Sequence, residues 1–138
     1  MKLATLLKIS RPRFWLYLAG TFLLGAVFVI PSPQALLSPA LVLAFLFFLI
    51  PANIFLYGIN DLADRDTDKF NAKKGSKEHL LRHKDIAQLR AWVWICAFVS
   101  VCVSAYFAWL ELWVASLLVL AFLALGAGYS ARPVRFKA

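Results

Sequence analysis

The sequence has few charged residues and few cysteines, and each shortage excludes a class of protein. Only 16% of the 138 residues are charged and 62% are hydrophobic, which lies well outside the range of soluble globular domains. The many aromatic side chains, among them 12 Phe and 5 Trp, exclude an intrinsically disordered chain. The two cysteines, Cys96 and Cys102, lie about 240° apart on a helix, so we expect no disulfide between them. A membrane protein is the class that remains.

Acidic residues are scarce as well, seven against 15 Lys and Arg, which gives a formal net charge of +8. Such an excess of positive charge can indicate nucleic-acid binding. Here, however, the charges are missing from four long apolar stretches and gather in the segments between them. We therefore expect no nucleic-acid partner and interpret the basic residues as flanks of membrane-spanning helices.

The four apolar stretches contain no Lys, Arg, Asp, Glu or His, and each is close to the ~20 residues that cross a bilayer as a helix. The first has bulky aromatics and no small-residue cleavage site before Pro31, so it is not a cleavable signal peptide. In the second, Pro51 removes a backbone hydrogen bond and should bend the helix. The sequence thus predicts an all-α, polytopic membrane bundle with transmembrane helices at residues 14–30, 41–59, 91–109 and 112–129.

All Lys and Arg residues lie on one side of such a bundle, before residue 14, in the connection 60–90, and after residue 129. The other side holds only the uncharged loop 31–40 and a short turn at 110–111. By the positive-inside rule the basic side is cytoplasmic. We expect an integral protein of the inner or plasma membrane, with both termini and the 60–90 loop in the cytoplasm. Apolar residues spaced among charges predict an interfacial amphipathic helix over 76–90.

The densest polar segment is Asn60–Asp68, where four acids and an amide occupy nine residues as the second helix leaves the membrane. At about 100° per residue, Asn60, Asp64 and Asp68 share one face with Asn53 and Tyr57, and Asp61 lies at its edge. Acids at such spacing repel one another, so the face needs a counter-charge. Hard oxygen ligands along successive turns favour Mg²⁺. The alternative is an acidic helix end that neighbouring lysines neutralise.

Basic residues flank this face and could contact an anion bound with the metal, since acids alone would repel a diphosphate. They are Lys69, Lys73, Lys74 and Lys77 in the loop and Arg135 and Lys137 after the fourth span, beside the polar side chain of Tyr129 at the end of that span. The last three could instead be a topological anchor.

Three motifs together resemble the UbiA-type intramembrane prenyltransferases, and the resemblance covers the whole chain. They are Ser-Arg-Pro-Arg-Phe-Trp at residues 10–15, Asn-Asp-x-x-Asp-x-x-x-Asp at residues 60–68, and Tyr-Ser-x-x-Pro-x-Arg-x-Lys at residues 129–137. The context around the second motif is most similar to the branch that includes lycopene elongases of carotenoid synthesis.

The resemblance implies a fold of about nine transmembrane helices, of which this chain holds the first part. It implies that an allylic prenyl diphosphate ionises with the help of Mg²⁺, and that its prenyl group passes to a lipophilic acceptor such as a carotenoid or quinone precursor. Asn60, Asp64 and Asp68 would bind the metal, with Asp61 in support. Candidates beside the diphosphate are Arg11, Arg13, Lys73, Lys74, Lys77, Tyr129, Arg135 and Lys137.

The family's second Asp-rich motif has no counterpart among the seven acidic residues. We therefore expect residues 1–138 to be a truncated prenyltransferase domain, a fragment or one piece of a split enzyme, with little activity unless a companion chain supplies the missing helices. The alternative is a small noncatalytic four-helix membrane protein that binds a cation or anionic lipid at its cytoplasmic face. A transporter protomer is disfavoured because no span carries an ionisable residue.

Overall fold

A computed structural model of the chain describes residues 3–65, 81 and 83–130. Within these residues the chain forms α-helices and short 3-10 turns and no strand, so the predicted all-α architecture is confirmed. The elements are α1 (Leu3–Ile9), η1 (Pro12–Phe14), α2 (Trp15–Val29), η2 (Pro33–Leu37), α3 (Pro39–Leu49), α4 (Pro51–Asp64), η4 (His83–Asp85), α5 (Ile86–Trp109) and α6 (Trp113–Ser130).

Four helical segments of the described chain are long and apolar enough to cross a membrane, which confirms the four predicted spans. They run over Pro12–Val29, Pro39–Asp64, His83–Trp109 and Trp113–Ser130. Their apolar side chains point outward as well as inward; Phe28 of α2 and Trp94 of α5, for example, are exposed. A helix that is hydrophobic on all sides suits lipid contact, and the chain is an integral membrane protein.

The second span is two helices, α3 and α4, because the chain breaks at Ile50 (φ −121°, ψ −65°). Pro51 has no backbone N–H to continue the helical ladder, and the last carbonyls of α3 lose their partners. The side-chain amide of Asn53 replaces two of those bonds, donating to the carbonyl oxygens of Phe48 (2.8 Å) and Leu49 (3.0 Å). The predicted bend at Pro51 is thus a full break that a buried amide bridges.

A short helix before the first span, α1, does not stand out in the sequence. Its residues Leu6 and Ile9 are buried in a core shared with α4 and α5. The chain then turns into α2 through Arg11, whose backbone is left-handed (φ 51°). Ser10 and Trp15 bracket this turn, because the Trp15 Nε1–H donates to the Ser10 hydroxyl at 3.0 Å and that hydroxyl donates to the Leu7 carbonyl at 2.7 Å.

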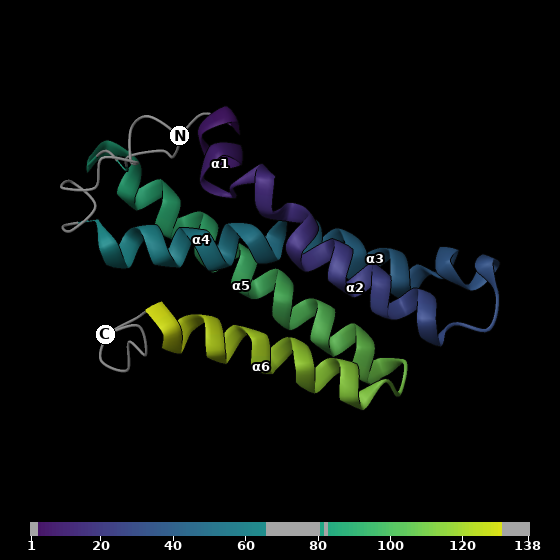
Figure 1. The fold of residues 1–138 in the computed structure, drawn as a ribbon. Helices are drawn as coiled ribbons and strands as arrows, with labels where there is room; N and C mark the ends of the chain where they lie inside the picture. The colour runs from purple at the N-terminus through teal and green to yellow at the C-terminus, as the bar shows by residue number, and fades with distance from the viewer. Residues whose placement is uncertain (1–2, 66–80, 82, 131–138) are drawn as a thin grey trace.

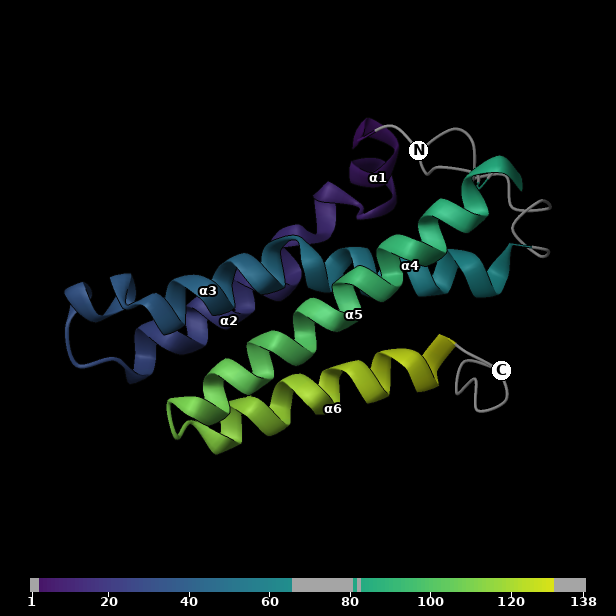
Figure 2. The same cartoon turned by 180° about the vertical axis from the view of Figure 1, so that it is seen from behind.

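Helix α4 holds the bundle together. It packs along α5, contacts α6 and α1, and follows directly on α3, which pairs with α2 (Figures 1 and 2). Gly58 permits the close approach of α4 to α5, because a Cβ there would lie 2.7 Å from Cγ2 of Val93. Gly126 does the same for α6, where a Cβ would lie 3.1 Å from Cε1 of Phe55. The polar C-terminal end of α4 is therefore placed by two closely packed neighbours.

The two ends of the bundle differ in charge. In Figure 1, α1, the end of α4, the start of α5 and the end of α6 lie together on the left, and we call this the polar end. The turn η2 and the connection between α5 and α6 lie at the other end. The Lys and Arg residues of the described chain all fall in segments at the polar end: Lys8, Arg11, Arg13, Arg65, Lys84 and Arg90. Helix α4 continues to Asp64 and α5 begins at Ile86, so helix enters the 60–90 connection from both ends.

The predicted interfacial helix over 76–90 is described at residues 81 and 83–90, and the rest of it lies outside the described residues. Where the structure does describe it, His83–Asp85 form a 3-10 turn and the α-helix starts only at Ile86, as part of α5.

Candidate functional site

A pocket of about 280 Å³ opens at the polar end of the bundle. Three separate parts of the chain build it: the turn after α1, the middle of α4 and the end of α6. Its lining combines a cation, an amide, hydroxyl groups and one aliphatic side chain, contributed by Arg11, Leu56, Tyr57, Asn60, Tyr129 and Ser130. Such a mixture of apolar wall and convergent polar groups is typical of a small-molecule site.

Arg11 is held on two sides. Its Nη2–H donates to Oδ1 of Asp61 at 3.2 Å, and the guanidinium carbon lies 4.7 Å from the centre of the Tyr57 ring. The Tyr57 ring in turn stacks on Phe14, with centroids 5.8 Å apart. The Arg11 side chain is 16% exposed and that of Asp61 only 3%, so the pair is largely shielded from solvent. In such surroundings charge pairing and the cation–π contact are stronger than on an open surface.

Helices α4 and α6 meet across the pocket through a long hydrogen bond. The Ser130 hydroxyl donates to the side-chain oxygen of Asn60 at 3.5 Å. Asn60 and Asp64 are one turn apart on α4, with Asp64 half-buried at the last helical position. A carboxylate thus lies one helical turn beyond the Asn60 amide, outside the residues that line the pocket.

The structure brings together some of the predicted site residues and separates others. Arg11, Asn60 and Tyr129 line one pocket, although the sequence places them far apart. Arg13, expected to be equivalent to Arg11, is exposed and stacks over Phe14 at 4.6 Å, and it does not line this pocket. Asp61 and Asp64 lie on α4 but do not line the pocket. The other predicted residues lie outside the described chain: Asp68, Lys73, Lys74, Lys77, Arg135 and Lys137.

Three residues of the pocket, Leu56, Tyr57 and Ser130, are not among the site residues that the sequence predicts. Tyr57 shares the polar face of α4 with Asn60, so its position was signalled by helical periodicity. Ser130 follows Tyr129 directly at the end of α6, and only the packing of α6 against α4 brings it to Asn60.

The oxygen donors along α4 fit Mg²⁺ in chemistry. The Asn60 amide and the Asp64 carboxylate share a helix face, and Mg²⁺ commonly takes one or two protein carboxylates and fills its remaining positions with water and phosphate oxygens. Within residues 3–65, 81 and 83–130, there is no group of three or more His, Cys, Asp or Glu side chains that could hold a metal ion. Asp61 is turned to Arg11, which leaves Asn60 and Asp64 as the donors on this face within the described part of α4.

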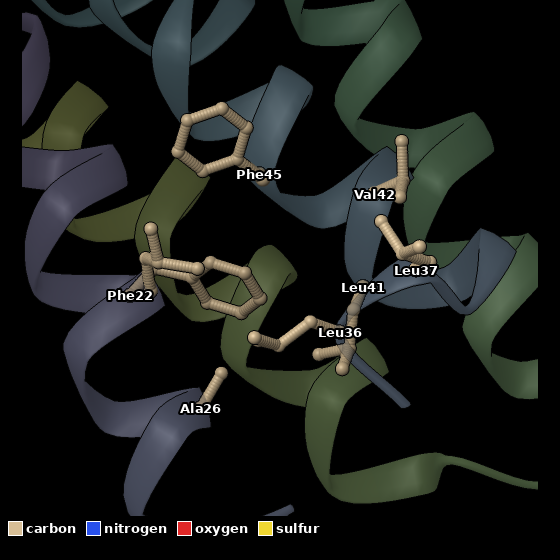
Figure 3. A pocket seen from close by; sticks show the side chains of 8 residues that line it. Phe22, Ala26, Leu36, Leu37, Leu41, Val42 and Phe45 are labelled. Carbon is tan, nitrogen blue, oxygen red and sulfur yellow. The ribbon is translucent and has the colours of Figure 1, made fainter. Parts of the chain in front are cut away.

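A second pocket, of about 240 Å³, lies between α2, η2 and α3 at the opposite end of the bundle. Figure 3 shows Phe22 and Ala26 from α2 facing Leu36, Leu41 and Phe45 across it. Its lining side chains are all hydrocarbon, so it suits an alkyl chain and offers nothing to a diphosphate.

Comparisons with known proteins place the sequence in a family. The sequence profile of the UbiA prenyltransferase family matches residues 14–138. A lycopene elongase/hydratase of Haloarcula japonica is 39% identical over 98% of this chain and 44% of the relative. The lycopene elongase/hydratase of Halobacterium salinarum is 42% identical over 94% of this chain and 45% of the relative. A protein of the same name from Corynebacterium glutamicum is 33% identical over 99% of this chain and 45% of the relative.

The chain therefore spans less than half the length of these relatives. No solved structure matches the chain with significance.

Proposed function

Because the chain belongs to the UbiA prenyltransferase family, we propose that its polar end is part of the active site of a membrane prenyltransferase. The substrate would be an allylic prenyl diphosphate and the acceptor a lipophilic molecule. The observation that supports this most is the polar pocket, in which Arg11, Asn60 and Tyr129 meet at the end of apolar spans. A charged head and a hydrocarbon tail of one substrate need that combination of surroundings.

Asn60 and Asp64, with Asp68 beyond the described residues, would hold Mg²⁺. When bound, the ion would neutralise the diphosphate and stabilise the charge that grows on it as it leaves. Lys73, Lys74, Lys77, Arg135 and Lys137 are further candidates for phosphate contacts on the same side of the membrane.

The described residues of the pocket have distinct tasks in this proposal. The Arg11 guanidinium binds diphosphate oxygens, because its planar set of N–H donors suits phosphate. The Ser130 hydroxyl keeps the Asn60 amide oriented. The Tyr57 ring supports the Arg11 guanidinium. The Tyr129 ring excludes water and presents its face to positive charge on the allyl group, as cation–π attraction favours.

For the acceptor we propose a linear carotenoid such as lycopene. The support is the name shared by relatives that are 33–42% identical over nearly the whole chain. We further propose that the polar end faces the cytoplasm, because the basic residues gather there.

The relatives are more than twice as long as this chain, so further helices would complete the pocket. We propose that these helices, carrying a second Asp-rich motif, come from a continuation of the chain or from a companion chain. By itself the 138-residue chain would bind the diphosphate and Mg²⁺ weakly and transfer little or no prenyl group.

The test is binding of dimethylallyl diphosphate, the smallest allylic prenyl diphosphate, to the full chain in lipid nanodiscs by calorimetry. We expect Mg²⁺ to strengthen binding, and Asp64→Asn to remove most of that gain, a change of about tenfold or more because a charged ligand is lost. Glu111→Gln is the matched control, since it removes one negative charge from an exposed residue in the turn between α5 and α6. Binding that neither Mg²⁺ nor Asp64→Asn alters would refute the proposal and favour a noncatalytic membrane protein.

A further inference from the structure

Asp61 differs from the other acidic residues of the described chain. Among residues 3–65, 81 and 83–130 it is the one charged residue that is buried, at 3% exposure. A carboxylate that is removed from water needs a counter-charge close by, and here Arg11 supplies it at 3.2 Å. A role for Asp61 must therefore explain both its burial and its ion pair with Arg11.

The direction of Asp61 separates it from the expected metal-binding face. On α4 it lies about 100° around the helix from Asn60, whereas Asp64 lies only about 40° from Asn60. Its Oδ1 accepts a hydrogen bond from the Arg11 guanidinium. That guanidinium carries a fixed positive charge, which would repel a second cation at the same carboxylate. Asp61 is thus placed to hold a cationic side chain, and poorly placed to bind Mg²⁺.

The backbone of Arg11 indicates that the guanidinium is held in place. Its φ of 51° lies in the left-handed region, which is unfavourable for a residue with a side chain. The bracket formed by Ser10 and Trp15 maintains this turn. The Arg11 side chain then passes over the Tyr57 ring and reaches both Asp61 and the polar pocket.

We propose that Asp61 is a positioning residue, whose carboxylate holds the Arg11 guanidinium at the wall of the polar pocket, where it binds diphosphate oxygens. This rests on the proposed function, because it assigns the anion bound there. Arginine has five N–H donors in a planar fork, so the same group can bond to a carboxylate and to a phosphate. The proposal replaces the supporting metal role expected for Asp61 from the sequence.

The test is a double-mutant cycle on the full chain in nanodiscs, with inorganic pyrophosphate as the probe, with and without Mg²⁺. Asp61→Asn and Arg11→Gln should each weaken pyrophosphate binding by about tenfold, as expected for a lost charge-assisted contact. The double variant should bind no more weakly than Arg11→Gln alone, because Asp61 acts through Arg11. The fold-gain from Mg²⁺ should be unchanged in Asp61→Asn, whereas Asp64→Asn should lose it.

Three results would overturn this role while leaving the proposed function intact. Losses that add in the double variant, or a reduced Mg²⁺ gain in Asp61→Asn, would make Asp61 a direct ligand. Pyrophosphate binding equal to wild type in Asp61→Asn would give it no role at the site. If the wild-type chain binds no pyrophosphate even with Mg²⁺, the proposed function fails and this role fails with it.

A charge-exchange variant tests whether weaker binding results from misfolding. The variant with Arg11→Asp and Asp61→Arg keeps an ion pair between the two positions and should recover most of the thermal stability that either single charge change removes. It removes the guanidinium from position 11, so it should still bind pyrophosphate about tenfold more weakly than wild type. An exchanged protein that folds and binds pyrophosphate as wild type would overturn the proposal.

Discussion

Two pockets of similar volume, about 280 Å³ at the polar end and about 240 Å³ at the other end, differ in the polarity of their lining and in the parts of the chain that form them. The apolar pocket is built from consecutive segments, α2, η2 and α3. The polar pocket joins the turn after α1 to α4 and α6, and its contacts cross 50 residues between Arg11 and Asp61 and 70 between Asn60 and Ser130. Pocket size therefore says little about function here; the long-range pairing of polar groups distinguishes the two.

Removing the cation from the polar pocket should have the largest effect on the protein. Arg11→Ala leaves the Asp61 carboxylate buried without that counter-charge, so we expect a loss of about 3 kcal/mol in the free energy of unfolding. Circular dichroism during unfolding in mixed detergent micelles measures it.

Arg13→Ala is the matched control, because Arg13 is exposed and should change stability by less than about 0.5 kcal/mol. Equal effects of the two substitutions would mean that the Arg11–Asp61 pair contributes no more than a surface charge.

A second test changes the helix packing behind the polar pocket. In Gly58→Ala the new Cβ would meet Cγ2 of Val93 at 2.7 Å, and a branched side chain gives way poorly, so we expect a destabilisation of about 2 kcal/mol. Because Asn60 follows two residues later on α4, pyrophosphate binding should weaken as well. Thermal unfolding and calorimetry measure the two effects.

Gly25→Ala is the control for this substitution, since nothing but the adjacent residues and the backbone of its own helix lies within 4 Å of the Cβ it would add. A helical Gly→Ala change in open space should leave the protein equally stable or slightly more stable. A Gly58→Ala protein as stable as wild type would mean that α4 and α5 can move apart at no cost.

The smallest effect is expected at the apolar pocket. Ala26→Leu adds hydrocarbon where the pocket has room, so unfolding should change by less than about 1 kcal/mol and pyrophosphate affinity should not change. Ala19→Leu is the contrast on the same helix, because Ala19 is completely buried and the larger side chain should cost about 2 kcal/mol. A fall in pyrophosphate affinity in Ala26→Leu would show that the two pockets are coupled.

Much of the architecture could be predicted because it depends on local signals. A run of apolar residues must form a helix in lipid, where every backbone polar group needs a partner within its own segment, and this identifies the spans. Pro51 indicates a break because proline lacks an N–H, and the spacing of Asn60 and Asp64 puts them on one face of α4. Their metal-binding role remains a prediction.

The parts that could not be predicted depend on contacts between distant residues. Arg11 and Arg13 look alike in the sequence, yet the left-handed turn at Arg11 sends one guanidinium to Asp61 and leaves the other over Phe14. Asp61 looks like one more acid of a metal-binding motif until α1 packs on α4 and brings Arg11 to it.

The sequence alone thus determined that this protein is a membrane helical bundle with one charged end, because hydrophobicity and charge along a chain act through the solvent that each segment meets. The tertiary structure decided which of the charged residues face one another. Charge pairing and close packing depend on distances of a few ångströms between helices, and those distances follow from how α4 packs against α1, α5 and α6.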